Sequence, residues 1–384
     1  MKITEIFVSI FEVPANTGRF DLVEQVTAGK QRWTATRSLM QRAERQTEEI
    51  HVLHVLTDEG IEGVCTVGDA RYTTLRAQDL IQLRILAADA DPFDRERLFA
   101  KLHAATRGMF AQPGWFGAFD NCLWDIAGKA AGLPVYALMG RARTACPAYY
   151  NSGGRTKEAV VEDSLKAVEM GFTAVKDHLT NSADENIEWF AAIRDAVGPQ
   201  VTLLHDAVLS HYNYDEALRV GRALEDLRFL WLEEPLPDRD QQGLQRLCAA
   251  LDIPVLAPET LMNDVDLSAQ WLISGATDWL RGNARVGVTG LRKLAHLAEM
   301  HNARIELNGP GGLFGLVHAH MVCALQNTSY YEYFPGGTRD ELGREIGLLN
   351  PPVPQNGMIQ PPTGPGWGAE WDWACFEKKR TATV

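Results

Sequence analysis

From about residue 145 onward, the sequence alternates regularly between short apolar runs and longer amphipathic segments. Eight runs have the length and composition of buried strands: PAYYN, TAVKDH, VTLLHD, FLWLEE, PVLAPE, DWLRGN, ARIELN and SYYEYF. The segments between them, such as EWFAAIRDAV and TGLRKLAHLAEMH, repeat their apolar residues at helical spacing. Because strands that alternate with helices pair in parallel, this order predicts an α/β fold with a parallel barrel. The alternative, a doubly wound open sheet, is disfavoured because no glycine-rich phosphate loop follows the first strand.

The residues before and after this region have other patterns. Within residues 1–143, the runs EEIHVLHVLTD and IEGVCTVGD predict strands and lead into the helical segment GAFDNCLWDIAGKAAG, so we expect a separate α+β domain there. Residues 341–384 are rich in proline and glycine and predict an ordered strap rather than a barrel element. The barrel is then expected over residues 144–340, and a chain of 384 residues is long enough for both domains.

Charge and cysteine content argue against several classes of partner. The formal net charge of -13 disfavours nucleic acid and an anionic membrane surface, although a bound metal and one lysine can reverse the sign locally for a small anionic substrate. No stretch approaches the roughly 18 consecutive apolar residues of a membrane span. The N-terminus lacks the apolar core of a signal peptide, and the six cysteines have no metal-type spacing. We therefore expect reduced thiols and a cytoplasmic protein.

Each predicted strand after the first carries a polar residue at its end. These residues are Lys176, Asp206, Glu233, Glu259, Asn283, Asn308 and Glu332. The carboxyl ends of barrel strands point into a shared mouth, where barrel active sites are assembled. A single acidic residue at a strand end is common and more often has no function. Seven polar residues that follow one another at nearly equal intervals predict an active site.

Three of these residues are acids on successive strands. The carboxylates of Asp206, Glu233 and Glu259 would converge in one cleft, where three like charges repel unless a cation neutralises them. Oxygen ligands suit a hard divalent ion, and Mg²⁺ is preferred because it keeps positions open for water and substrate. The alternative, three solvated acids on unrelated loops, is disfavoured because FLWLEE and PVLAPE are apolar up to the acid.

A lysine and a histidine lie on the neighbouring strand. Lys176 and His178 are two residues apart and share one face, with Asp177 on the other. A lysine that is partly desolvated beside a metal has its ammonium form disfavoured, so Lys176 is predicted to act as a base. His178 would either hold Lys176 in place or transfer a proton itself. Taken alone, a Lys-x-His at a strand end is more often structural than catalytic.

Together these motifs resemble the enolase superfamily, in particular its mandelate racemase-like branch of acid-sugar dehydratases and racemases. KDH lies where that branch carries Lys-x-Lys, and HDA, WLEEP and APE lie where it carries its metal ligands. GAFDNCLWDIAGKAAGLPVYALMG resembles the helix that joins cap to barrel, and PGWGAEW resembles the return of the tail to the cap. The resemblance implies a modified (β/α)7β barrel with an α+β capping domain formed by the N-terminal region and the C-terminal tail. It also implies a homo-oligomer, one Mg²⁺ per subunit, and removal of the proton next to a substrate carboxylate.

The sequence departs from the branch in ways that affect its chemistry. His178 replaces the second lysine of Lys-x-Lys. The His–Asp dyad of the opposite face is missing: Asn283 (or Gly282, because the register is uncertain by one residue) and Asn308 stand there, and neither can act as an acid or base. Both asparagines could bind substrate hydroxyls. Glu332 lies where the branch has a glutamate near the substrate carboxylate, and in its protonated form it could donate a hydrogen bond to the enolate.

These observations predict dehydration of a sugar acid, an aldonate or aldarate, to a 2-keto-3-deoxy acid. Lys176 would remove the proton at C2, and the C3 hydroxyl would leave as water. Arg19, Arg71 and Tyr72, in polar stretches of the cap, are candidate substrate contacts, although each is more often a solvated surface residue. The alternatives are a racemase or epimerase, which needs a base on each face, and a non-catalytic metabolite-binding relative.

Overall fold

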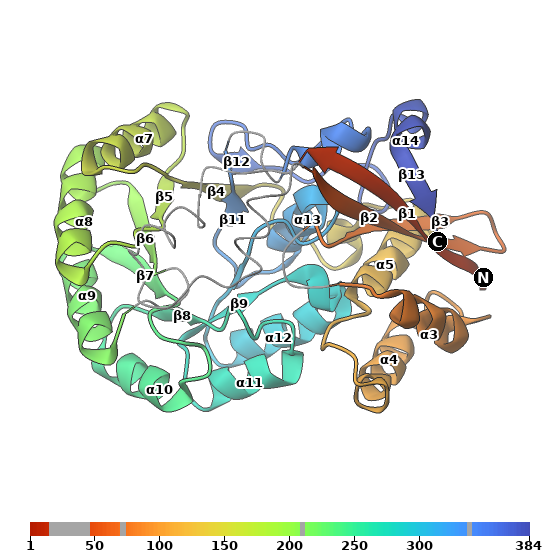
Figure 1. Cartoon of the computed structure of the whole chain (residues 1–384), viewed down its shortest axis with the longest axis horizontal. Helices are drawn as coiled ribbons and strands as arrows, with labels where there is room; N and C mark the ends of the chain where they lie inside the picture. Colours follow the sequence, from red (N-terminus) through yellow and green to blue (C-terminus); the bar gives the residue numbers. More distant parts are fainter. Residues whose placement is uncertain (15–46, 70–73, 208–211, 336–339) are drawn as a thin grey trace.

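The computed structural model describes residues 1–14, 47–69, 74–207, 212–335 and 340–384 and shows a barrel beside a cap (Figure 1). Eight parallel strands form the barrel: β4 (Cys146–Asn151), β5 (Ala174–Asp177), β6 (Thr202–Asp206), β7 (Phe229–Glu233), β8 (Val255–Ala257), β9 (Trp279–Gly282), β10 (Ile305–Leu307) and β11 (Tyr331–Tyr333). Their order is β10-β9-β8-β7-β6-β5-β4-β11. The backbone nitrogen of Ile305 donates to the oxygen of Asn327 over 3.0 Å, which brings the chain before β11 beside β10 and closes the sheet.

Seven helices alternate with these strands in the part of the barrel that the structure describes. They are α7 (Lys157–Glu169), α8 (Ala183–Val197), α9 (Tyr214–Asp226), α10 (Gln241–Ala250), α11 (Val265–Ile273), α12 (Val288–Met300) and α13 (Leu316–Ala324). Helices α8 and α9 begin with polar caps. The side chains of Ser182 and Asn213 accept hydrogen bonds from the third helical backbone nitrogen, and the glutamate side chain at that third position accepts one from the backbone nitrogen of the capping residue. The predicted (β/α)7β barrel is therefore confirmed.

The alternation of side chains along the strands separates two cores. Inside the barrel, Tyr149, Ala174, Leu204, Trp231 and Leu256 form a small apolar floor, while the outward-facing residues pack against the helices in the main core. The residue two positions beyond Ala174, Leu204 or Trp231 points into the barrel again, directly above this floor. On three strands that residue is polar: Lys176, Asp206 and Glu233.

The cap contains an antiparallel sheet of order β13-β1-β2-β3. Its strands are β1 (Ile3–Pro14), β2 (Thr47–Thr57), β3 (Glu62–Val67) and β13 (Arg380–Thr383), and its helices are α3 (Ala77–Ala87), α4 (Arg95–Met109), α5 (Gly117–Ala131), α6 (Val135–Leu138) and α14 (Trp373–Lys379). Strand β13 pairs with β1, so the C-terminal tail completes the sheet of the N-terminal region. Shorter elements are β12 (Met358–Ile359), which pairs with β4, and the 3-10 turns η1 (Ala284–Val286), η2 (Leu313–Gly315) and η3 (Leu342–Ile346).

Helix α5 connects cap, barrel and tail, as the resemblance implied. The Asn121 side chain donates to the oxygen of Ala284 over 2.9 Å and accepts from the nitrogen of Val288 over 2.9 Å. The Asp125 carboxylate accepts from the nitrogens of Val64 and Trp367 at 3.0 and 2.9 Å. These buried polar bonds place the cap against the end of β9, next to the mouth of the barrel.

Gly117→Ala should lower the free energy of unfolding by ~1–3 kcal/mol, the usual cost of an added methyl group without space. A Cβ at Gly117 would lie 1.7 Å from the backbone oxygen of Arg285, and backbone cannot rotate away. Gly108→Ala, in α4, is the matched control because a Cβ there has no atom within 4 Å. Urea unfolding followed by tryptophan fluorescence checks the difference, and equal midpoints for the two variants would contradict this close contact.

In the described ranges, no helix is long and apolar enough to cross a membrane.

Candidate active site

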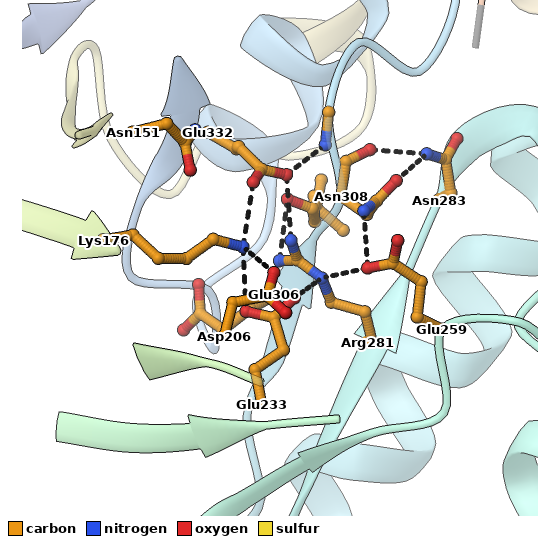
Figure 2. A network of polar contacts seen from close by, with 12 residues as sticks. Asn151, Lys176, Asp206, Glu233, Glu259, Arg281, Asn283, Glu306, Asn308 and Glu332 are labelled. Atoms are coloured by element: carbon orange, nitrogen blue, oxygen red, sulfur yellow. Dashed lines mark hydrogen bonds and ion pairs between the residues drawn. The ribbon is translucent and has the colours of Figure 1, made fainter. Parts of the chain in front are cut away.

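Lys176 lies at the centre of a cluster of carboxylates at the barrel mouth (Figure 2). Its Nζ atom is 3.0 Å from Oδ2 of Asp206, 2.9 Å from Oε2 of Glu233 and 3.0 Å from Oε1 of Glu332. The lysine side chain is 1% exposed. Strands β5, β6, β7 and β11 each supply one member, which confirms that the polar residues at these strand ends converge.

Arg281 is a member of the cluster that sequence reasoning missed. Its Nε atom is 2.9 Å from Oε1 of Glu233 and 3.5 Å from Oε2 of Glu259, and one terminal nitrogen is 2.8 Å from Oε2 of Glu332. The alternation of side chains between the two faces of a strand is the sequence signal that could have identified Arg281. Arg281 is two residues before Asn283 and therefore lies on the same inner face of β9.

Two cations and two carboxylates form a closed ring of ion pairs. Glu233 and Glu332 each use one oxygen for Lys176 and the other for Arg281. Asp206 extends the ring from Lys176, and Glu259 extends it from Arg281. Trp231 adds a hydrogen bond of 3.1 Å from its indole nitrogen to Glu233, and the backbone nitrogen of Gly309 donates to Glu332.

The charges around Lys176 and Glu332 shift the pKa values of the two groups in opposite directions. Burial lowers the pKa of Lys176, as predicted, but the adjacent carboxylates of Asp206, Glu233 and Glu332 outweigh it and hold that pKa well above its usual value. Burial likewise raises the pKa of Glu332, but Lys176 and Arg281 reverse the shift and lower it below the usual range. These neighbours favour the ammonium form of Lys176 and the carboxylate form of Glu332, a balance that a bound divalent ion would change.

The donor set fits a divalent ion in chemistry and in charge. Four carboxyl groups (Asp206, Glu233, Glu259, Glu332) face two cations, so at least one negative charge is uncompensated even when Glu233 carries a proton. Burial, together with the charges of Asp206 and Glu259, raises the pKa of Glu233 to about 8 although Arg281 and Lys176 oppose the shift. Among the described residues, Oε1 of Glu233 accepts no well-aligned hydrogen bond.

Asp206, Glu233 and Glu259 would hold such an ion through oxygen atoms, the donors that Mg²⁺ prefers. As the described side chains stand, no three His, Cys, Asp or Glu residues surround one point closely enough to bind a metal. Lys176 lies between Asp206 and Glu233, and Arg281 lies between Glu233 and Glu259. The cations thus occupy the positions between the predicted ligands.

His178 lies nearer the opening than Lys176 and on the same side. Its Nε2 atom is 3.2 Å from Oδ2 of Asp206, and its side chain is 14% exposed. The ring centroid of Phe334 is 6.4 Å away. An imidazole in this position is partly accessible from the mouth and has a carboxylate beside its Nε2 atom.

The two asparagines on the opposite side bind protein groups. Nδ2 of Asn308 donates to Oε2 of Glu259 over 2.7 Å. Nδ2 of Asn283 donates to the backbone oxygen of Asn308 over 2.5 Å, and its Oδ1 accepts from the nitrogen of Arg285 over 2.9 Å. The register is now decided: a Cβ at Gly282 would meet side chains of the main core, so Asn283 faces inward.

A buried network behind the mouth connects the strands that carry Lys176 and Asp206. Nδ1 of His205 is 2.7 Å from Oδ1 of Asp177, and its Nε2 is 3.1 Å from the hydroxyl of Tyr212. These contacts join the outer faces of β5 and β6. The remaining predicted substrate contacts, Arg19, Arg71 and Tyr72, lie outside the described residues.

Two family models match the chain. "Mandelate racemase / muconate lactonizing enzyme, N-terminal domain" matches residues 24–140, and "Enolase C-terminal domain-like" matches residues 159–375. A D-galactonate dehydratase family member from Catenulispora acidiphila is 27% identical over 350 residues, which cover 82% of this chain and 81% of the relative. A D-mannonate dehydratase from Caulobacter vibrioides is 27% identical over 367 residues, covering 83% of this chain and 88% of the relative.

Solved structures are also similar. D-glucarate dehydratase from Agrobacterium tumefaciens, in complex with magnesium, superimposes with a TM-score of 0.82 at 27% identity, and all of both chains is covered. L-talarate/galactarate dehydratase from Salmonella typhimurium has a TM-score of 0.78 at 22% identity, covering 100% of this chain and 93% of the other, and at that identity it supports the fold alone.

Proposed function

The chain belongs to the mandelate racemase/muconate lactonizing enzyme family of the enolase superfamily, and on that premise we propose that it dehydrates a sugar acid to a 2-keto-3-deoxy acid. Relatives named as dehydratases of galactonate, mannonate and gluconate support this reaction class. The substrate is an aldonate or aldarate, and the cofactor is one Mg²⁺ per subunit. We also propose, from the resemblance and the cysteine pattern, a cytoplasmic homo-oligomer.

One observation carries the proposal: the described part of the mouth has proton-transfer groups on one side only. Lys176 and His178 lie on that side, while the amides of Asn283 and Asn308 lie on the other. An amide cannot accept a proton at neutral pH. Racemisation requires a base on each face of the substrate, whereas dehydration requires only that one side remove a proton and return one to the leaving hydroxyl. The arrangement therefore favours dehydration.

The roles that we assign to the residues follow from how exposed their side chains are. Asp206, Glu233 and Glu259 would hold the Mg²⁺, which when bound stabilises negative charge developing on the substrate carboxylate. Lys176 lies within 3.0 Å of three carboxylates and is 1% exposed, so its nitrogen faces the ligands of that ion rather than the opening. His178, at 14% exposure, is the group that can reach the substrate, so we assign it the proton at C2. The same imidazolium then protonates the C3 hydroxyl as it leaves.

A screen of aldonic and aldaric acids with Mg²⁺ tests the proposal. We expect at least one acid to give a 2-keto product that semicarbazide detects. An enzyme that epimerised its substrate without 2-keto product would instead be a racemase. Binding of an acid, measured by calorimetry, without any turnover would identify a metabolite-binding relative.

A further inference from the structure

Arg281 has a position that the proposed reaction does not by itself explain. Its side chain is 0% exposed, and its guanidinium extends from the apolar floor, where it donates to the hydroxyl of Tyr149 over 3.3 Å, up to Glu259 at the mouth (Figure 2). A second terminal nitrogen donates to the backbone oxygen of Leu307 over 3.2 Å. In the described structure this group touches protein on all sides.

The contacts of Arg281 are directed at residues that we assign to the metal. Its Nε atom lies between Glu233 and Glu259, at 2.9 and 3.5 Å from their oxygens. Both oxygens of Glu233 already face a cation, because Lys176 lies 2.9 Å from the other one. A metal ion that binds these two carboxylates must therefore share them with the guanidinium or replace it.

We propose that Arg281 is a positioning residue of the metal site, whose guanidinium serves as the resident counter-cation of Glu233 and Glu259 and competes with Mg²⁺ for them. This inference rests on the proposed function, since it takes these carboxylates as the ligands of Mg²⁺. Arg281 keeps the ligands apart from one another and in place when the ion is absent, and its charge weakens the binding of the ion.

The sign of the effect distinguishes this role from a purely structural one. A residue that only supports the barrel would, when replaced, loosen the site and weaken Mg²⁺ binding. Removal of a like charge from beside a divalent ion has the opposite effect, because the repulsion in a buried site is large. The metal-free protein should at the same time become less stable, since Glu233, Glu259 and Glu332 lose a counter-ion.

The experiment measures Mg²⁺ affinity by calorimetry and thermal unfolding with and without Mg²⁺ on the full chain. Arg281→Gln should bind Mg²⁺ at least ~10-fold more tightly than wild type, a conservative figure for removing a positive charge a few ångströms from the ion. Its unfolding temperature should fall without metal and recover with it. Arg281→Lys keeps the charge and should stay near the wild-type affinity.

Arg194→Met is the control for a general loss of stability. Arg194 donates to the backbone oxygens of four described residues. These residues are Leu227, Gly198, Val201 and Arg228. Loss of the Arg194 side chain should therefore lower stability without changing Mg²⁺ affinity. Normal Mg²⁺ binding by wild type with equal or weaker binding by Arg281→Gln would overturn this inference alone. An Arg281→Gln protein that stays unfolded at every Mg²⁺ concentration would also overturn it. Absence of Mg²⁺ binding by wild type would overturn the proposed function and this inference with it.

Discussion

Turnover should be abolished when Mg²⁺ is removed by chelation, and Glu233→Gln should abolish it with Mg²⁺ present. Glu233 is the carboxylate that contacts both Lys176 and Arg281, and it is 0% exposed. Its replacement by an amide removes one negative charge from a site that needs excess negative charge to bind a divalent ion. Substrate binding should weaken as well, because the ion would hold the substrate carboxylate.

Glu306→Gln is the matched control for that experiment. Glu306 is also a fully buried glutamate, in β10 of the barrel. Its carboxylate accepts hydrogen bonds from the backbone nitrogens of Ser329 and Tyr330, in the segment directly before β11. Its variant should lose some stability and keep its Mg²⁺-dependent activity. Activity and metal content measured on the same samples check both variants. Full activity in chelator, with no metal detected, would refute the proposed metal site.

His178→Ala should reduce the rate at least ~10²-fold, the low end for loss of a positioned general base. His178 is the proton-transfer group that the mouth exposes, and no amide across from it can replace it. Substrate deuterated at C2 should show a primary isotope effect with the wild-type enzyme. His178→Ala should not exchange the C2 proton of recovered substrate with solvent.

Two further variants separate the base from its supporting charges. Lys176→Ala should also lose at least ~10²-fold, because it removes the group that contacts Asp206, Glu233 and Glu332 in the ring. Asn308→Ala should cost less, because its amide acts by holding Glu259. If His178→Ala still exchanged the C2 proton at a near-normal rate, Lys176 or a group on the other face would be the base. Retained exchange in both His178→Ala and Lys176→Ala would rule out the one-sided dehydratase.

The ring of ion pairs is better explained by function than by stability. Burial of each ion removes its hydration at a cost on the order of several kcal/mol. Ion pairing offsets that cost only when the geometry of the pair is good. Well-packed apolar side chains of similar volume are often as stabilising as a buried ion pair. The floor of Tyr149, Leu204 and Trp231 directly beneath the ring is apolar in this way. Loss of a single member is harmful because it leaves the opposite charge buried without compensation. The ring therefore makes the site sensitive to every charge in it.

Much of the fold and part of the site follow from local patterns in the sequence. The repeat of strand and helix predicted the barrel, because side-chain periodicity is a property of consecutive residues. The strand ends predicted that Lys176, Asp206, Glu233 and Glu332 meet, because parallel strands of a barrel present their carboxyl ends at one mouth. Neither prediction required a distance between residues that are far apart in sequence.

Only the tertiary structure decided the register of β9, the place of Arg281 and which charges lie next to Lys176 and Glu332. The pKa of Lys176 was predicted to fall through burial and a neighbouring metal ion, whereas three carboxylates from three other strands raise it. Glu332 was considered as a hydrogen-bond donor in its protonated form, whereas Lys176 and Arg281 lower its pKa. Burial and charge act on the pKa with opposite signs, and their balance depends on distances of a few ångströms across the barrel. The sequence determines which residues face the mouth, whereas their protonation depends on how closely the fold brings their charges together.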